Sequence, residues 1–439
     1  MSLLKSPHGG IHVKYYKELT CNLPIITAPE PEKVVIPLQQ HTGIPCESLV
    51  KVSDKVKVGE KIGEAQGFIT APIHSSVSGT VKSITDLINP NGVKCRAITI
   101  ENDGNYEIGY QKPNKDYTEM STEEILSLIK EGGVVGLGGA GFPTHAKLNA
   151  RDKKIDEIIV NCAECEPYLT SDQVAIDSYP EKVIIGLKIA MKVMNASRGY
   201  FGIEDNKPKT IKILQDNIKN EDNLKVKVLK TEYPQGDAKR MIYSITNKVV
   251  PHGVRSAERG VQVINSSTAI AIYDAVVEGK PLYERIITMT GHGINKPSNL
   301  KVRIGMNFQE LIDFCGGLNS TNGKVIMGGP MMGIGQYNME SPVIKPLGGL
   351  LFLNDEESKK QPITACIKCG KCVEVCPISL LPVNLHILSM REKFEEAKKL
   401  NIMSCIECGS CSYICPSKRP ILEYIRLGKY MIKSNKKNK

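Results

Sequence analysis

Aromatic residues are scarce in this chain, at 5% of its 439 residues. Proteins that bind single-stranded nucleic acid usually stack its bases on aromatic side chains. The net charge is +10, and the densest basic run lies at the C-terminus without interleaved aromatics, with Lys433, Lys436, Lys437 and Lys439. We therefore expect no nucleic-acid partner. The run is either solvated charge or a contact for an acidic partner or anionic lipid headgroups.

Long hydrophobic runs are also missing. No segment approaches the ~18 unbroken apolar residues that a membrane-spanning helix needs. The first seven residues lack the apolar stretch typical of a signal peptide. We expect a cytoplasmic protein that is soluble or lies peripherally on a membrane.

Cysteine, in contrast, is abundant, and most of it follows one pattern. Cys366-x-x-Cys369-x-x-Cys372-x-x-x-Cys376-Pro is repeated as Cys405-x-x-Cys408-x-x-Cys411-x-x-x-Cys415-Pro. This spacing is typical of two [4Fe–4S] clusters in which the fourth cysteine of each run ligates the other cluster. The predicted ligand sets are Cys366, Cys369, Cys372 and Cys415 for one cluster, and Cys405, Cys408, Cys411 and Cys376 for the other. A pair of zinc ribbons is the alternative, but structural zinc prefers two separated ligand pairs. Paired clusters indicate one-electron transfer.

The other six cysteines are scattered and are predicted to be buried small hydrophobes: Cys21, Cys46, Cys95, Cys162, Cys165 and Cys315. Cys162 and Cys165 form a Cys-x-x-Cys pair that could be a redox disulfide, although packing is the better interpretation.

Residues 30–102 alternate short β-rich runs with turns, which predicts strands at 34–37, 49–52, 56–63 and 79–81. The pattern is similar to the barrel-sandwich hybrid of biotinyl and lipoyl carriers. The acceptor lysine of those carriers is missing, because Ile73-His74-Ser75-Ser76 occupies that region. We expect a structural or docking role.

From residue 118 the pattern changes. Ser121-Thr122-Glu123-Glu124 is a capping box for a helix at 123–131. Strands at 158–160 and 226–229 then alternate with helices at 180–196, 237–246 and 268–278, which predicts an α/β layer with a parallel sheet. Short strands and a helix at 308–314 indicate a small α+β module over 285–352. A polar linker at 354–362 leads to the cysteine runs, with helices expected at 382–388 and 392–399.

A glycine-rich loop, Gly136-Leu137-Gly138-Gly139-Ala140-Gly141, follows a predicted strand at 134–135. Glycines let the backbone approach a phosphate, and a dinucleotide fingerprint is the usual interpretation of the spacing alone. The next strand ends in Asn161-Cys162-Ala163-Glu164-Cys165-Glu166. Alternate residues of an extended segment face one way, so Glu164 and Glu166 could point together into a cleft, or be two solvated acids.

The run Gly-Leu-Gly-Gly-Ala-Gly-Phe-Pro-Thr-x-x-Lys with Asn161-x-x-Glu164-x-Glu166 resembles the flavin- and NADH-binding subunit of respiratory complex I and related diaphorases. In that family the loop and lysine hold the FMN phosphate, and the phenylalanine stacks on nicotinamide or flavin. The resemblance implies catalytic roles for Phe142, Glu164 and Glu166. The implied cofactor-binding residues are Gly136, Gly138, Gly139, Lys147, Asn161, Glu164, Glu166, Gly236, Asp237 and Asn265.

The order of these features, with Pro7-His8-Gly9-Gly10-Ile11-His12 and Tyr233-Pro234-Gln235-Gly236, resembles the C subunit of Rnf complexes over nearly the whole chain. That family implies a multi-domain α/β protein. The expected parts are an N-terminal segment with a barrel-sandwich hybrid (1–112), a Rossmann-like FMN/NADH domain (113–284), a β-grasp SLBB-like module (285–353), an α-helical ferredoxin domain with two [4Fe–4S] clusters (360–428) and a basic tail (429–439).

The implied function is that of a peripheral subunit on the cytoplasmic face of the cell membrane. Its expected cofactors are FMN and two [4Fe–4S] clusters, and its substrate is NAD(H). Integral-membrane and peripheral Rnf subunits are the expected partners, and ferredoxin-derived electrons would reach NAD⁺ with Na⁺ or H⁺ translocation. The alternatives are a soluble flavin/iron–sulfur cobalamin reductase and a non-enzymatic protein with structural clusters.

Overall fold

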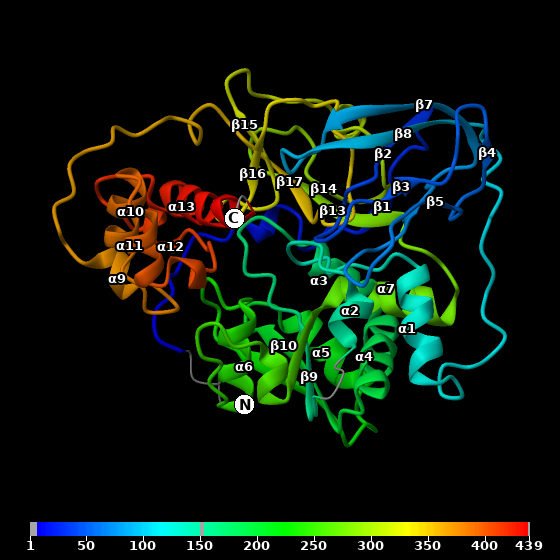
Figure 1. Ribbon diagram of the computed structural model, residues 1–439, viewed down its shortest axis with the longest axis horizontal. Helices are drawn as coiled ribbons and strands as arrows, with labels where there is room; N and C mark the ends of the chain where they lie inside the picture. Colours follow the sequence, from blue (N-terminus) through cyan, green and yellow to red (C-terminus); the bar gives the residue numbers. More distant parts are fainter. Residues whose placement is uncertain (1–6, 150–152, 438–439) are drawn as a thin grey trace.

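The computed structural model describes residues 7–149 and 153–437, with side chains up to residue 434. Figure 1 shows the parallel-sheet domain in green, the sheets of the N-terminal and third modules beside it, and a separate helical domain in orange and red at one side. None of the helices in the described ranges has both the length and the apolar character needed to cross a bilayer.

The central domain is built on a four-stranded parallel sheet of order β11-β10-β9-β12. Its strands are β9 (Glu157–Asn161), β10 (Arg198–Glu204), β11 (Leu224–Leu229) and β12 (Val261–Asn265). Ile158 and Val160 point into the larger core cluster, and Ile159 points into a second cluster on the other face. Both faces are therefore covered, which explains the unbroken apolar run of β9.

Helices cover this sheet on both sides. The predicted capping box is present, because Ser121 and Glu124 bond each other's backbone N–H groups at the start of α1. The predicted helices lie within two residues of their expected ends, and α2, α3 and α5 are additional. The bounds are α1 (Thr122–Glu131), α2 (Thr144–Leu148), α3 (Ser171–Ser178), α4 (Pro180–Met194), α5 (Pro208–Asn217), α6 (Ala238–Thr246) and α7 (Ser266–Val277).

The N-terminal module consists of two small antiparallel sheets, of order β2-β8-β7-β4 and β3-β5-β6. The strands are β2 (Lys33–Pro37), β3 (Glu47–Ser48), β4 (Lys55–Val56), β5 (Lys61–Glu64), β6 (Ile73–His74), β7 (Gly79–Ile88) and β8 (Lys94–Asn102). The strand predicted at 49–52 is wrong: Leu49 and Val52 are more than half exposed in a turn. His74, Ser75 and Ser76 are buried, and Ser76 bonds the Ile304 carbonyl of the third module, so this region is a docking contact.

The third module contains a six-stranded mixed sheet of order β1-β14-β13-β17-β15-β16. Its members are β1 (Ile25–Thr27), β13 (Glu284–Thr290), β14 (Ser298–Arg303), β15 (Lys324–Met327), β16 (Ile334–Gln336) and β17 (Gly349–Leu353), with helix α8 (Phe308–Phe314) at its predicted position. Strand β1 comes from the N-terminal segment, yet it pairs with β14 at the edge of this sheet.

The C-terminal domain is helical. Its elements are α9 (Lys371–Glu374), α10 (Pro382–Met390), α11 (Phe394–Lys399), α12 (Ser410–Tyr413) and α13 (Ile421–Lys437). The basic tail is not a separate segment, because α13 continues through its first residues to Lys437; Lys439 lies outside the described residues, and no side chain is described beyond residue 434.

The N-terminal segment joins this helical domain to the parallel-sheet domain. Ile11 pairs with Tyr233 through two backbone hydrogen bonds, and the Gly10 N–H donates to the Val375 carbonyl. Arg240 of α6 donates to the carbonyls of His8 and Gly9. In Figure 1 the segment is the blue trace between the orange helices and the green domain.

Candidate functional site

The order in which the chain adds strands to the parallel sheet reverses between β9 and β12. From β9 the chain adds β10 and then β11 on one side, and β12 lies on the other side. In open α/β sheets, ligands bind at the carboxyl ends of the strands where this switch occurs. Asn161 and Asn265 are the last residues of β9 and β12 and are paired in register. Two of the predicted cofactor residues therefore lie at the switch point.

The glycine loop folds over this switch point. The Leu137 N–H donates to Thr268 Oγ1 in the first turn of α7, at 3.0 Å. A Cβ on Gly138 would lie 2.8 Å from Asn265 Nδ2, so a larger residue there would displace the Asn265 side chain, while at Gly139 no atom lies within 4 Å of the Cβ position. The strand predicted at 134–135 is wrong: Val135 forms only an isolated bridge with Pro143, because the chain turns immediately into the loop.

Lys147 lies on α2, directly after the loop. Its ammonium group has no hydrogen bond or ion pair with any residue in the described ranges, and burial lowers its pKa to about 8. A partly buried cation without a counter-charge is suited to a bound anion. The open side of Gly139 and the lone Lys147 ammonium together fit the phosphate of FMN.

Asn265 and Glu164 belong to one network beside the loop. Asn265 Oδ1 accepts from the Thr268 N–H as the N-cap of α7, and its Nδ2 donates to Asp172 at 2.6 Å. Glu164 accepts from the N–H groups of Asp172 and Gln173 at the start of α3. Burial raises the pKa of Glu164.

Glu166 points elsewhere, so of the two possibilities that the sequence left open, the one in which both acids point together into a cleft is wrong. Its carboxylate accepts from the N–H groups of Met331 and Met332. Strand β9 ends at Asn161, and Glu164 has a φ of 44°, so the alternation of an extended strand does not continue. Burial raises the pKa of Glu166 to about 7.

Gly236 and Asp237 follow β11 in the chain and lie at the end of β9, where Asn161 is. Asn161 Nδ2 donates to the Gly236 carbonyl at 2.7 Å, and the Gly236 N–H donates to Cys165 Sγ at 3.3 Å. The Asp237 carboxylate caps α6 by accepting from two backbone N–H groups. Asp237 thus fixes the helix start, while Gly236 lies directly against Asn161.

Phe142 and the Cys162–Cys165 pair complete the predicted residues of this region. Phe142 is 37% exposed, so its ring is open to a stacking partner. Cys162 is buried in the main core, and Cys165 packs near Ile11 and Tyr233. Burial raises the pKa of both thiols, which matches packing rather than thiolate chemistry.

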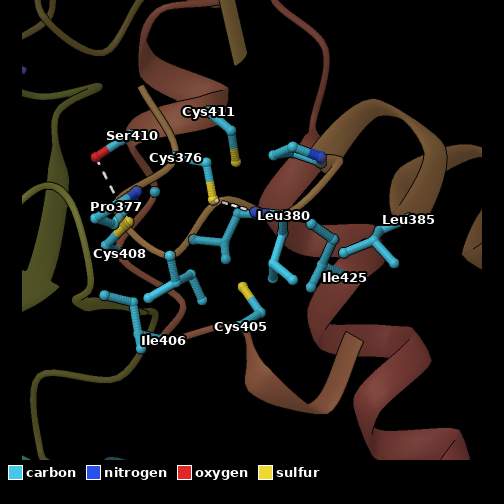
Figure 2. A pocket seen from close by; sticks show the side chains of 14 residues that line it. Cys376, Pro377, Leu380, Leu385, Cys405, Ile406, Cys408, Ser410, Cys411 and Ile425 are labelled. Atoms are coloured by element: carbon cyan, nitrogen blue, oxygen red, sulfur yellow. Dashed lines mark hydrogen bonds between the residues drawn. The ribbon is translucent and has the colours of Figure 1, made fainter. Parts of the chain in front are cut away.

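Four cysteines surround one cavity in the helical domain. Figure 2 shows Cys376, Cys405, Cys408 and Cys411 together with apolar neighbours. This is the second predicted ligand set, including the cysteine taken from the first run. Among the described residues, no three His, Cys, Asp or Glu side chains converge on a point that could hold a single metal ion. The thiols line the walls of a cavity, a layout suited to a four-iron cubane.

The first ligand set lies nearer the surface. Cys366 and Cys369 are exposed, and Cys372 and Cys415 are partly buried. Burial raises the pKa of the Cys372 thiol, and the nearby Cys415 and Cys366 thiols raise it further. Cys372 and Cys415 pack against the same hydrophobic cluster of the helical domain, and the exchange of fourth ligands stays a prediction.

Tyr233 connects the two regions. Its side chain is fully buried, and its hydroxyl donates to the Cys408 carbonyl at 2.7 Å. Three residues later the chain reaches Gly236, which contacts Asn161. The cavity of the second ligand set is thus the one adjacent to the strand ends.

Sequence reasoning missed two buried lysines behind the site. Lys17 donates to the carbonyls of Glu164, Glu166 and Leu169, at 2.5–3.0 Å. Lys207 donates to the Ala163 carbonyl at 2.6 Å. Lys17 is about 150 positions away in the chain, so no local pattern could have indicated it.

A parallel-sheet domain with an anion-binding loop at its switch point, next to two four-cysteine sets, defines an iron–sulfur flavoprotein class. Family models agree along the chain: an RnfC barrel sandwich hybrid domain (5–105), a Nuo51 FMN-binding domain (129–274), an SLBB domain (286–335) and a 4Fe-4S dicluster domain (365–418). The cofactors are therefore FMN and two [4Fe–4S] clusters.

Relatives extend over the whole chain. The chain is 44% identical over 96% of its length to the C subunit of the Na(+)-translocating ferredoxin:NAD(+) oxidoreductase complex of Acetobacterium woodii, and covers 96% of it. It is also 44% identical over 97% of its length to the C subunit of the proton-translocating complex of Clostridium ljungdahlii, covering 93% of that protein. The chain belongs to the family of C subunits of Rnf-type ion-translocating ferredoxin:NAD⁺ oxidoreductase complexes.

A solved structure shares the fold at low sequence identity. An NAD⁺-reducing [NiFe]-hydrogenase structure in the H₂-reduced state matches 72% of this chain and 63% of its own, with a TM-score of 0.51 and 14% identity.

Proposed function

We propose that this subunit exchanges hydride with NAD(H) at FMN bound over the ends of β9 and β12, and exchanges single electrons through the two clusters. A flavin supplies the needed chemistry, because it takes two electrons as hydride and releases them one at a time. The soluble cobalamin reductase is not favoured, since the relatives that cover the whole chain are complex subunits.

The residues have distinct tasks in this proposal. The loop of Gly136, Gly138 and Gly139 and the Lys147 ammonium would hold the FMN phosphate. Phe142 would stack on the nicotinamide. Asn161, Asn265 and Gly236 would line the flavin, while Glu164 and Asp237 would fix the helix starts around it through their bonds to backbone N–H groups. Glu166 would fix the backbone at Met331 and Met332, which faces the cysteine cavity, by accepting hydrogen bonds from their N–H groups.

The observation that carries the proposal is the link through Tyr233. The hydroxyl of this buried residue donates to the backbone carbonyl of Cys408, one of the predicted cluster ligands. Three residues further along the chain, the Gly236 carbonyl accepts from Asn161 Nδ2. We infer that the cubane of Cys376, Cys405, Cys408 and Cys411 is the neighbour of the flavin, and that the cubane of Cys366, Cys369, Cys372 and Cys415 follows it.

The test is an anaerobic titration of FMN-loaded protein with NADH, followed by flavin absorbance and cluster EPR together. We expect the flavin to bleach and cluster signals to appear in the same titration. Cluster signals that stay unchanged while the flavin is reduced would contradict the proposed route.

The phosphate site can be tested through Lys147. Lys147→Ala removes a charge-assisted contact worth about 1.5–3 kcal/mol, so the Kd for FMN should rise about 10- to 100-fold, as measured by flavin fluorescence quenching. Lys230→Ala, at an exposed lysine after β11, is the control and should leave the Kd unchanged. An unchanged Kd for Lys147→Ala would remove this residue from the site.

The setting is a membrane complex, because the relatives are complex subunits. We propose that the chain docks peripherally, on the cytoplasmic face, against integral-membrane subunits, and that ferredoxin-derived electrons reach NAD⁺ through it while those subunits move Na⁺ or H⁺. Retention of the chain on washed membranes only when the other subunits are co-expressed would support this placement.

The division of the chain at residues 112, 284 and 353 also stays a prediction.

A further inference from the structure

The N-terminal module holds the glycine loop from outside. The Thr42 hydroxyl donates to the Ala140 carbonyl at 2.6 Å, and the Thr42 N–H donates to the Gly141 carbonyl at 3.1 Å. Thr42 lies in the segment between β2 and β3, 98 positions before Ala140. A single residue of another module therefore fixes two consecutive peptide groups of the loop.

Thr42 is attached to a rigid support. It is exposed, but the two residues before it, Gln40 and His41, are buried. Gln40 Oε1 accepts from the Lys345 N–H of the third module at 2.9 Å. His41 Nε2 accepts from the Ala71 N–H at 3.2 Å. The position of the Thr42 hydroxyl is therefore set by buried neighbours rather than by the surface.

The loop approaches this support most closely at Gly141. This glycine has a φ of 65°, and a Cβ there would lie 3.1 Å from both the Gln40 carbonyl oxygen and Pro346 Cγ. The start of the loop has a different anchor, because the Leu137 N–H donates to Thr268 of α7. The two ends of the loop are thus held by different parts of the molecule.

The contacts with Thr42 also determine where two N–H groups of the loop point. In a trans peptide, the N–H of one residue is antiparallel to the carbonyl of the residue before it. Since the carbonyls of Ala140 and Gly141 are directed at Thr42, the N–H groups of Gly141 and Phe142 point away from the N-terminal module. Within residues 7–149 and 153–437, neither of them donates to a protein acceptor. Both donors are available to a ligand, beside the open ring of Phe142.

We propose that Thr42 is a positioning residue for NADH, which orients residues 140–142 of the loop without touching a reacting atom. This inference rests on the proposed function. Phe142 directly follows the two fixed peptide groups, so release of this part of the loop would misplace both the ring and the two N–H donors. The FMN phosphate is assigned to residues 136–139 and Lys147, which Thr42 does not contact. Loss of the Thr42 hydroxyl should therefore weaken the binding of NADH and spare that of FMN.

The kinetic test replaces only the hydroxyl. Thr42→Val keeps the size of the side chain and the backbone N–H. In dye reduction by FMN-loaded protein, the KM for NADH should rise about threefold to tenfold, the range for one hydrogen bond, while kcat stays within about twofold. Thr42→Ser restores the hydroxyl and should return KM to the wild-type value. The matched control is Thr85→Val, at an exposed position of β7 in the same module, which should also match wild type.

Two binding measurements do not depend on turnover. Flavin fluorescence quenching should give the same Kd for FMN in Thr42→Val and in wild type. Calorimetric titration of FMN-loaded protein with tetrahydro-NADH, which cannot donate hydride, should give a Kd that rises by the same factor as the KM.

Three results would each overturn the inference. These are an unchanged KM and an unchanged Kd for the dinucleotide in Thr42→Val, an equal rise in its Kd for FMN, or a KM in Thr42→Ser as high as that in Thr42→Val. Failure of wild-type protein to bind FMN, or to reduce the dye with NADH, would instead contradict the proposed function. The two proposals can therefore fail separately.

Discussion

At the scale of single residues, the turn after β9 depends on two buried ammonium groups. Lys17 donates to three carbonyls of this turn, and Lys207 donates to a fourth and to Glu204. Burial lowers the pKa of Lys17. A buried charge is costly unless it is hydrogen-bonded, so these lysines are positioning residues for the backbone that carries Glu164 and Glu166.

Lys17→Met tests this role, because methionine keeps the apolar length and removes the donors. Three carbonyls then lose a buried partner, and we expect about 3 kcal/mol lower stability. The KM for NADH should also rise more than kcat falls, since the turn lines the binding region and contains no reacting atom. Lys14→Met, at an exposed position of the same segment, is the control. A stability loss without any change in KM would reduce Lys17 to a purely structural residue.

At the scale of elements, the sequence was most informative where chemistry is local. The capping box of Ser121 and Glu124 predicted the start of α1, and the thiol spacing predicted which cysteines line the cavity shown in Figure 2. The capping box depends on residues a few positions apart in the chain. The cysteine ligands follow from the regular spacing within two copies of one motif. Asn265 was predicted only from the family resemblance. The structure gives the physical reason for an asparagine at this position, since its side chain caps α7 and faces Gly138.

Elements whose geometry depends on distant partners could not be predicted. Glu164 and Glu166 were expected to alternate as in a strand, but the turn is bent toward Lys17 and its acids go to α3 and to Met331. Strand β1 joins a sheet formed almost entirely by residues about 260 or more positions later. Long-range pairing of this kind leaves no periodic signal in the sequence.

At the scale of the whole molecule, Lys345 joins three modules. From the third module, its ammonium donates to the carbonyls of Pro72 in the N-terminal module and Gly133 in the parallel-sheet domain, both at 2.7 Å. Burial lowers its pKa from 10.5 to about 7. Below about pH 7 both the folded and the unfolded chain carry the proton, and the full cost of burying the charge applies.

This predicts a pH dependence of stability. Between about pH 7 and 10 the folded chain has released the Lys345 proton while the unfolded chain still holds it, so stability rises with pH by at most about 1.4 kcal/mol per unit. Lys345→Met lacks this contribution. Denaturant unfolding followed by tyrosine fluorescence at several pH values should show a steeper rise for wild type than for the variant; identical slopes would contradict the assignment.

The last prediction concerns the junction between the flavin and cluster domains. Gly9 has a φ of 76°, and a Cβ there would lie 2.6 Å from the Cys376 carbonyl oxygen, beside the cavity of the inner cluster. Gly9→Ala must therefore push the N-terminal segment or the cluster domain aside. Gly92→Ala is the matched control, because Gly92 has a φ of 78° and no atom within 4 Å of its Cβ position, so it shares the backbone strain without the clash. Rapid mixing with NADH should show flavin reduction at the wild-type rate in both variants, and cluster reduction slowed severalfold only in Gly9→Ala. Equal cluster reduction in the two variants would mean that contact through this segment does not set the distance that electrons cross.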